Sequence, residues 1–402
     1  MGYGNRKMKK KVLVINLGWE QEPLLDKLTE YDVEIYGVHY DEDYYKKPRY
    51  KDILICDIRD LDKILAFAKK IDVDAVISDE CDYSHFAQAL VSQSLNIPGP
   101  RISEAQISLN KYLQRTRAKQ NNILIPDYSL VTSIDDIYKF LKKVSFPIII
   151  KPVDNRGSFG VNKINDDADI VEAYEDALVN SHSRLVIVEK FIEGKHITVD
   201  GYIFRNEGIK SLAIADKILA PDNRQVALDI QYPASFSSSF YNEILKINEN
   251  VNSALGYRFG MTHSEYMVTK DNQVYLIESA NRGGGVYTSE VIVPNVSGVD
   301  ILSQYICDAL DMKKSFVKKR IERNKVILKF FNLKAGKIQD IKGIHKFIKY
   351  KEILKFKIFL RNGDIIKTIT NDANRHGFVI ALNKDIDIEK MIKENIEVIY
   401  ES

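Results

Sequence analysis

Cysteine is scarce in this sequence of 402 residues, which contains only Cys56, Cys81 and Cys307. The three lie far apart and show no metal-ligand spacing, which argues against a disulfide framework and favours a reducing compartment. A run of about 18 apolar residues, the length that crosses a bilayer, is also missing. The basic start precedes an apolar stretch that is short, lacks a small-residue cleavage site and runs into Glu20 and Glu22, so it predicts a first strand and not a signal peptide. We therefore expect a cytoplasmic protein.

Neither sign of charge dominates, because the sequence contains 58 Lys and Arg residues and 56 Asp and Glu residues. Such a balance leaves no overall electrostatic signature of a partner such as nucleic acid or an anionic membrane. The lysine-rich run "KKSFVKKRIERNK" is interpreted as a solvated, flexible junction, because no aromatic residues that stack on bases are interleaved with it. The length and the 45% apolar composition are those of a globular protein with two or three packed units.

From Lys11 to about Asn110, short apolar strands alternate with amphipathic helices. The strand-like runs are "VLVIN", "VEIYGV", "DILIC" and "DAVIS", and helical patterns begin near Pro23, at "LDKILAFAKKI" and at "YSHFAQALVSQSL". This alternation predicts an α/β, doubly wound N-terminal domain with a parallel sheet. Such sheets bind ligands beyond the carboxyl ends of their strands, which here are followed by Gly18, Trp19, Asp79 and Glu80. A dinucleotide site is not indicated, because "NLGW" lacks the GxGxxG fingerprint.

A second region follows the break at "LNIPGP". Ser133 with Asp136 resembles a capping box and predicts a helix over "IDDIYKFLKKV", and Asp166 with Asp169 does the same for "IVEAYEDALV". Each helix precedes an apolar strand with charged residues at its end, "FPIIIKP" and "LVIVEKF". After about Asn324, strands and one late helix, "IEKMIKEN", form a third unit, so the whole chain is predicted to be α+β.

The stretch "HSEYMVTKDNQVYLIESANRGGG" predicts a β-hairpin, because two β-prone runs flank a turn-forming cluster at residues 270–273. Folding it about residues 271–272 pairs residue 274 with 269, residue 276 with 267, and Glu278 with Glu265. Opposed side chains lie roughly 4.5 to 5.5 Å apart at Cβ, where like charges destabilise a sheet. Two such carboxylates suit Mg²⁺, which takes oxygen ligands and is shared with phosphates. On the hairpin alone, two hydrated, solvent-facing carboxylates are an equally open alternative.

Two further loops carry residues suited to nucleotide binding. The loop in "KPVDNRGSFGVNK" lacks the Gly-Lys-Ser/Thr of a Walker A motif, and it predicts a hairpin flap whose backbone N–H groups can approach phosphate oxygens. A plain turn beside a surface Lys151 is the alternative. In "VIVEKFIEGKHITVDGY", the strand end at Glu189 and Lys190 can read a purine edge through its main chain, and His196 can reach sugar hydroxyls. A surface histidine after a turn is the alternative there.

The candidate binding features follow one another along the chain. Their order is Lys111, Lys151, the glycine flap, the Glu-Lys strand end, and the paired-Glu hairpin followed by Asn-Arg-Gly-Gly-Gly. Phosphoryl transfer from ATP needs cationic side chains that bind phosphates, a pocket for the purine base and carboxylates that bind a metal ion. On these motifs the sequence resembles ATP-grasp enzymes over essentially its whole length, in the L-amino-acid-ligase-like and biotin-carboxylase-like branches. The "THSEY" motif, with His263 two residues before the first Glu, looks most like the L-amino-acid ligases.

The resemblance implies a domain order: a preATP-grasp domain over residues 1–110, an ATP-grasp domain over 111–315 and a C-terminal domain over 316–402, the ATP-grasp domain being divided into subdomains 111–190 and 191–315. It also implies residues that bind ATP through side chain or main chain, namely Lys111, Lys151, Gly157, Ser158, Gly160, Glu189, Lys190, Ile192 and His196. The lysines would hold phosphates under the flap, the strand end would contact adenine, and His196 would lie at the ribose.

The same resemblance assigns Glu265 and Glu278 to Mg²⁺ or Mn²⁺. The residues implied at the substrate are Arg282, Gly283, Gly284 and Glu80, with Arg282 holding a carboxylate or an acyl-phosphate through its planar fork. His263 is the nearest titratable candidate for deprotonating an amine. Asn281 stands one place later than the Asn of the family's Glu-x-Asn-x-Arg motif, and strand alternation turns it to the other face, so the metal site is expected to rest on the two Glu.

The leading hypothesis is an ATP- and Mg²⁺-dependent ligase that joins a small carboxylate to an amine, the amine of an amino acid, through an acyl-phosphate. A carboxylase that activates bicarbonate, and a nucleotide-binding protein without turnover, are the alternatives. Specificity is expected to reside in residues 18–20, 79–82 and the stretch "DKILAPDNRQVALDIQYPASFSSS". The resemblance also suggests a homodimer. The balanced charge and the lack of long apolar runs lead us to expect neither nucleic acid nor membrane as a partner.

Overall fold

The computed structural model of the protein describes residues 9–43, 48–220, 226–314, 324–369, 371–383 and 387–401. The centre of the lysine-rich run, residues 315–323, lies outside these ranges, so its interpretation as a flexible junction stays a prediction, and so does any role of residues 221–225 in specificity. Across the described ranges, no helix is both long enough and apolar enough to span a bilayer.

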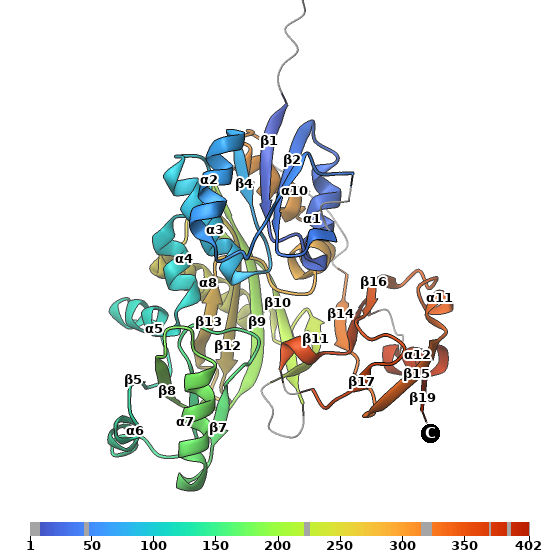
Figure 1. Ribbon diagram of the computed structural model, residues 1–402. Helices are drawn as coiled ribbons and strands as arrows, with labels where there is room; N and C mark the ends of the chain where they lie inside the picture. Colours follow the sequence, from blue (N-terminus) through green and yellow to red (C-terminus); the bar gives the residue numbers. More distant parts are fainter. Residues whose placement is uncertain are drawn as a thin grey trace, which may run out of the picture.

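The N-terminal region forms the predicted parallel sheet. Strands β1 (Lys10–Ile15), β2 (Val33–His39), β3 (Asp52–Ile55) and β4 (Ala75–Ile77) are ordered β3-β2-β1-β4. Helices α2 (Leu61–Ile71) and α3 (Asp82–Ser94) cover one face. Helix α1 (Glu22–Leu28) covers the other face together with α10 (Ile301–Ala309), which comes from much later in the chain. The shared core with α10 fixes the N-terminal sheet onto the centre of the molecule (Figure 1).

A small antiparallel sheet carries the two predicted strands with charged ends. It contains β5 (Tyr128–Val131), β8 (Val186–Lys190), β6 (Ile148–Pro152) and β7 (Asn162–Ile164) in that order, with helices α6 (Ile134–Leu141) and α7 (Ile170–Val179) packed in its core. Ser133 caps α6 as predicted, because its side chain accepts a hydrogen bond from the Asp136 N–H. Asp166 instead caps a short 3₁₀ turn, Asp167–Asp169, through the Ala168 N–H, and α7 begins only after that turn.

The largest sheet lies at the centre of the molecule and is ordered β13-β12-β9-β10-β11-β14-β18-β16 (Figure 1). Its first five strands are β13 (Val274–Ala280), β12 (Gly260–Val268), β9 (Lys195–Phe204), β10 (Gly208–Leu219) and β11 (Ala227–Tyr232). The other three are β14 (Val326–Phe330), β18 (Gly377–Leu382) and β16 (Ile353–Ile358). Because β14 pairs with β11, C-terminal strands extend the sheet that carries the hairpin.

The remaining elements frame this sheet. Helices α4 (Ile102–Leu109) and α5 (Lys111–Gln120) connect the N-terminal region to the small sheet, α8 (Ser238–Leu255) packs beside β10, and α9 (Val293–Ser297) precedes α10. A C-terminal sheet of β15 (Gly336–Lys342), β17 (Ile365–Ile366) and β19 (Glu397–Tyr400) is accompanied by α11 (Ile344–Phe347) and by the predicted late helix, α12 (Ile388–Asn395).

Candidate active site

The predicted hairpin is formed by β12 and β13, and Glu265 lies opposite Glu278. The predicted register nearer the turn was wrong: residue 268, not 269, pairs with residue 274, and residue 266, not 267, pairs with 276. A β-bulge leaves residue 277 without an opposite partner. Simple alternation counted from the turn cannot detect a bulge, and the glutamates were paired correctly because the bulge shifts the register by one residue and cancels the error at the turn.

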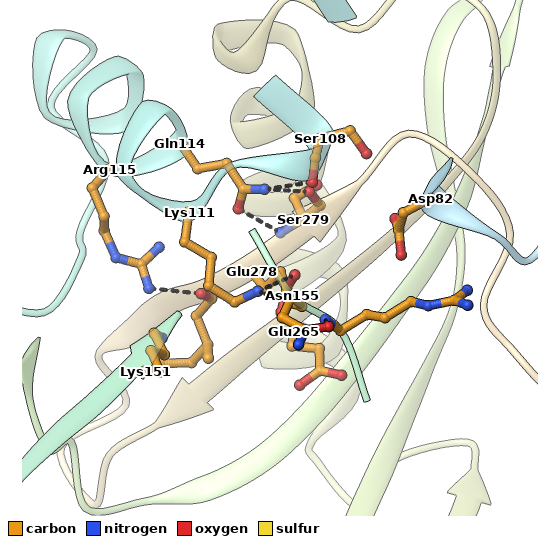
Figure 2. Close-up of polar contacts among 12 residues, drawn as sticks. Asp82, Ser108, Lys111, Gln114, Arg115, Lys151, Asn155, Glu265, Glu278 and Ser279 are labelled. Atoms are coloured by element: carbon orange, nitrogen blue, oxygen red, sulfur yellow. Dashed lines mark hydrogen bonds and ion pairs between the residues drawn. The ribbon is translucent and has the colours of Figure 1, made fainter. Parts of the chain in front are cut away.

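Each glutamate of the pair has its own cationic or histidine partner. Lys111 Nζ lies 2.9 Å from Glu278 Oε1 and also donates to the Asn155 carbonyl at 2.7 Å (Figure 2). On the other strand, Glu265 accepts from Lys217 Nζ at 2.7 Å and from His196 Nε2 at 2.9 Å. These partners compensate the repulsion that two facing carboxylates would otherwise cause.

Burial alone would raise the pKa of Glu265, but the charge of Lys217 and the hydrogen bond with His196 lower that pKa well below its ordinary value. The pKa of His196 is lowered by burial and by the charge of Lys217. His196 is therefore neutral near pH 7, and its Nε2–H donates to an ionised Glu265. The structure thus places His196 directly beside one of the two carboxylates.

Lys151 and Glu189 belong to a buried ion triad with Arg115. Lys151 Nζ lies 2.7 Å from Glu189 Oε2, and Arg115 Nε lies 2.8 Å from Glu189 Oε1. Burial and the charge of Arg115 act against the charged form of Lys151, and the lysine pKa falls below its ordinary value even though Glu189 favours that form. For Glu189, burial acts to raise the pKa, but the two cations lower it to about 2. The Glu189 side chain therefore fixes the orientation of a strand-end lysine.

The neighbouring Lys190 points elsewhere. Its Nζ donates to the carbonyls of Ser145 and Phe146 at 2.8 and 3.1 Å. The Phe191 N–H donates to the Pro147 carbonyl at 3.1 Å. The strand end is thereby held against the loop that precedes β6, and Ile192, which follows, is half-buried. A main-chain contact of this strand end with adenine stays a prediction.

Arg282 makes a two-point ion pair with Asp82, the first residue of α3. Its Nε and Nη2 lie 2.7 and 2.8 Å from the two Asp82 oxygens, and Nη1 donates to the Gly283 carbonyl at 2.8 Å. A guanidinium carries five N–H donors, so two remain for a further oxyanion. The pair joins the N-terminal region to the end of β13 and fixes the plane of the arginine.

The glycines after Arg282 are crowded by protein atoms. A Cβ on Gly283 would meet Asp79 Oδ1 at 2.4 Å, and one on Gly284 would meet His263 Nδ1 at 2.7 Å. Only Gly285 of this run has open space around it. Glu80, predicted at the substrate, is buried and accepts hydrogen bonds from the N–H groups of residues 286 and 287 at 3.0 and 2.6 Å. Burial and the nearby Asp79 carboxylate raise the Glu80 pKa well above its ordinary value.

The glycine flap between β6 and β7 contacts two other regions of the chain. Gly157, Ser158 and Gly160 all adopt positive φ, at 62°, 62° and 68°, a conformation that glycine adopts readily. Arg156 Nη1 lies 3.2 Å from Cys81 Sγ of the N-terminal region. The Gly157 carbonyl accepts from the Asp372 N–H at 3.1 Å, so the C-terminal region touches the flap as well.

His263 is part of a hydrogen-bonded chain beside the glutamate pair. Its Nδ1 lies 2.7 Å from Asp200 Oδ1, and Asp200 Oδ2 accepts from the Tyr232 hydroxyl at 2.6 Å. In the neutral imidazole, a carboxylate that accepts from Nδ1–H leaves Nε2 as the hydrogen-bond acceptor. By contrast, Asn281 is buried, and its amide nitrogen donates to the carbonyls of Phe259 and Met261 at 2.9 and 3.1 Å. Asn281 thus serves the packing of the hairpin base.

Arg115 and Asp200 at this site were not predicted from the sequence, and Lys217 was predicted only as part of the stretch expected to carry specificity. Arg115 follows Lys111 by four residues on α5, and side chains at that spacing share a helix face, so its proximity was detectable in principle. Lys217 on β10 and Asp200 on β9 reach the site only through strand pairing across the sheet. No local pattern in the sequence marks either of them.

Comparison with known proteins gives a family match for the middle of the chain: residues 144–290 match the ATP-grasp domain. The urea amidolyase of Saccharomyces cerevisiae is 22% identical over 415 residues, which cover 94% of this chain and 22% of that protein. The L-arginine-specific L-amino acid ligase of Bacillus subtilis is 23% identical over 280 residues, which cover 67% of this chain and 66% of that ligase. The chain therefore spans about a fifth of the first relative and about two thirds of the second.

Among solved structures, the L-amino acid ligase from Bacillus licheniformis superimposes with a TM-score of 0.85 at 18% identity, over 98% of this chain and all of that one. At this identity the likeness concerns the fold. This likeness confirms the predicted fold class, in which α/β and α+β regions are arranged as in ATP-grasp enzymes.

Proposed function

We propose that this chain, in which residues 144–290 form an ATP-grasp domain, is an ATP- and Mg²⁺-dependent ligase that joins a carboxylate to an amine through an acyl-phosphate. The observation that carries the proposal is the facing pair Glu265 and Glu278, with Lys111 bound to Glu278 and Lys217 bound to Glu265. Figure 2 shows Lys111 and Lys151 on the same side of this pair. A sheet built only for stability gains nothing from two opposed carboxylates, whereas phosphoryl transfer needs such a mixture of metal ligands and phosphate-binding cations.

The donor set of this pair fits Mg²⁺, since it consists of carboxylate oxygens. Within the described ranges, no group of three or more His, Cys, Asp or Glu side chains is arranged to hold a metal ion. Mg²⁺ suits a platform of two carboxylates because it keeps several waters and takes its other ligands from substrate phosphates. Glu265 and Glu278 would hold the ion, and Mn²⁺ would fit the same oxygens. When bound, the ion would neutralise negative charge on the phosphates.

In this proposal the chain's own residues orient the reactants. Lys111 and Lys151 attract the phosphates, and Arg282, fixed by Asp82, holds the carboxylate with its two remaining donors. A carboxylate oxygen attacks the γ-phosphorus while the bond to the bridging oxygen breaks, and ADP leaves. The amine then displaces phosphate and gives its proton to Nε2 of His263. The flap excludes water, which would otherwise hydrolyse the acyl-phosphate.

Arg282→Ala is expected to lower ADP release by roughly 10²- to 10³-fold while MgADP affinity changes little, because the arginine faces the acyl group in this proposal. ADP release by a coupled assay and MgADP binding by calorimetry check the prediction. Asp82→Asn serves as a control, because it keeps the guanidinium of Arg282 and removes only the charged partner that fixes its orientation. The loss of ADP release in this variant is expected to be smaller than in Arg282→Ala. An equal loss of nucleotide binding and turnover in Arg282→Ala would mean that this arginine serves the nucleotide.

The function itself is tested by an ADP-release screen over pairs of the common amino acids, with product masses measured by spectrometry. We expect amino-acid-dependent ADP release together with a product whose mass equals the two reactants minus water. ADP release that requires bicarbonate and no amine would identify the carboxylase alternative. Nucleotide binding without turnover on any substrate pair or with bicarbonate would overturn the ligase proposal.

A further inference from the structure

A short C-terminal segment, residues 371–376, lies against the glycine flap. It connects β17 to β18, the strand that pairs with β14 in the central sheet. Its Asp372 N–H donates to the Gly157 carbonyl at 3.1 Å, and a Cβ on Gly157 would meet the Asp372 Cβ at 3.3 Å. The segment is therefore packed directly against the glycine flap, although no sequence motif connects the two.

Arg375 in this segment is buried but incompletely hydrogen-bonded. Its guanidinium carbon lies 3.5 Å from the ring centroid of Phe330, and Nη2 lies 2.7 Å from Asp372 Oδ1. The arginine side chain is only 9% exposed, whereas that of Asp372 is 41% exposed. Nε of Arg375 is buried and has no hydrogen-bond partner among the described residues.

Arg375 also interacts electrostatically with one glutamate of the pair, Glu265. Burial lowers its pKa, while Asp372 and Glu265 act in the opposite direction, so the Glu265 carboxylate is within electrostatic range. Glu265 already has Lys217 and His196 as direct partners and does not need a third cation for charge balance. Asp372 is the direct ion-pair partner of Arg375 through Nη2, and the Nε–H of Arg375 remains as a donor for another negative group.

A purely structural role does not account for these features. A buried donor without a partner costs free energy, and replacing buried ionic groups by apolar ones of similar size is often neutral or stabilising. An apolar side chain of similar length would keep a contact with Phe330 and lose only the cation–π attraction and the ion pair with Asp372. Resting on the proposed function, we propose that Arg375 is a further substrate-binding residue, whose unpartnered Nε–H holds an oxyanion at the flap side of the site. The oxyanion is either the γ-phosphoryl group or the carboxylate of the acceptor, since both present oxygens to a planar fork.

The test uses full-length Arg375→Met and Arg375→Lys, with Arg361→Met as a matched control on an exposed arginine of the same C-terminal region. Binding of Mg-bound ADP and of a non-hydrolysable ATP analogue is measured by calorimetry, and turnover is measured as ADP release with a mixture of the common L-amino acids. If Arg375 holds the γ-phosphoryl group, Arg375→Met weakens the ATP analogue by about tenfold or more and leaves ADP unchanged. If it holds the carboxylate, both nucleotides bind normally and turnover falls by a similar factor at sub-saturating amino acids.

Arg375→Lys keeps the charge and the aliphatic contact with Phe330, so it should restore part of whichever quantity the Met variant loses. The assignment is overturned if both Arg375 variants, folded by circular dichroism, keep analogue binding and turnover within about twofold of Arg361→Met. It is equally overturned if Arg375→Met does not fold and Arg375→Lys behaves as the wild type. Failure of the wild-type protein to bind MgADP would instead reject the proposed function, and this assignment with it.

Discussion

The Glu278→Gln variant is expected to keep its fold and to lose ADP release by roughly 10³-fold with every substrate. Gln keeps the size of the side chain, so the hairpin and its cross-strand packing stay in place. The charge that would hold the metal is removed, and Lys111 loses the partner that lies 2.9 Å away. Lys111 still donates to the Asn155 carbonyl, and Glu278 is 34% exposed on its side chain, so the cost in folding stability is smaller than that of breaking a fully buried ion pair.

Circular dichroism and a coupled assay of ADP release measure these two effects. Glu243→Gln, on an exposed position of α8, is the matched control for the same chemical change and should behave as the wild type. Lys111→Met tests whether the loss arises from the displaced lysine, because it removes the lysine charge and keeps the carboxylate pair. Undiminished turnover in Glu278→Gln would eliminate the assignment of this residue to the metal.

Much of the fold follows from patterns that are local in the sequence. The strands and helices of the N-terminal region were predicted because short apolar strands alternate with amphipathic helical patterns there. Parallel pairing of the strands follows from that alternation. The facing pair Glu265 and Glu278 was predictable because a hairpin brings together residues that are close in the chain. Even there, the bulge at residue 277 was not visible, since it depends on hydrogen bonds and not on residue type.

Contacts between distant segments explain what the sequence could not predict. Arg282 was expected to hold a substrate group, and the sequence did not indicate that Asp82, which is 200 residues away, accepts two of its hydrogen bonds. Glu189 was assigned to adenine through its main chain alone, and its side chain turns out to be the carboxylate of a buried ion triad. Such pairs carry no spacing signal, because the tertiary fold alone decides which charged residues meet.

A substitution in the buried ion triad of Glu189, Lys151 and Arg115 is expected to have the largest effect on the free energy of unfolding. Glu189 is 2% exposed and faces both Lys151 and Arg115, so Glu189→Gln leaves two buried cations without a counter-charge. Removal of one partner of a buried ion pair destabilises a protein by about 3 to 5 kcal/mol. We expect a loss of that size in urea denaturation followed by circular dichroism. Amide hydrogen exchange of β6, β8 and α5 should show where the destabilisation acts, since these elements carry Lys151, Glu189 and Arg115. Glu172→Gln, exposed on α7, is the matched control.

The loss should also depend on pH in a defined direction. Burial acts to raise the Glu189 pKa, but Arg115 and Lys151 lower it from an ordinary 4.5 to about 2 in the folded protein. A carboxylate with a lowered pKa contributes stability that is complete above its unfolded value and is lost as the pH falls toward the folded value. The shift corresponds to about 3 kcal/mol, in line with the mutational estimate. The free energies of unfolding of wild type and Glu189→Gln should therefore converge as the pH falls from about 4.5 toward about 2. A difference that stays constant over this range would show that Gln acts through lost packing and not through lost charge.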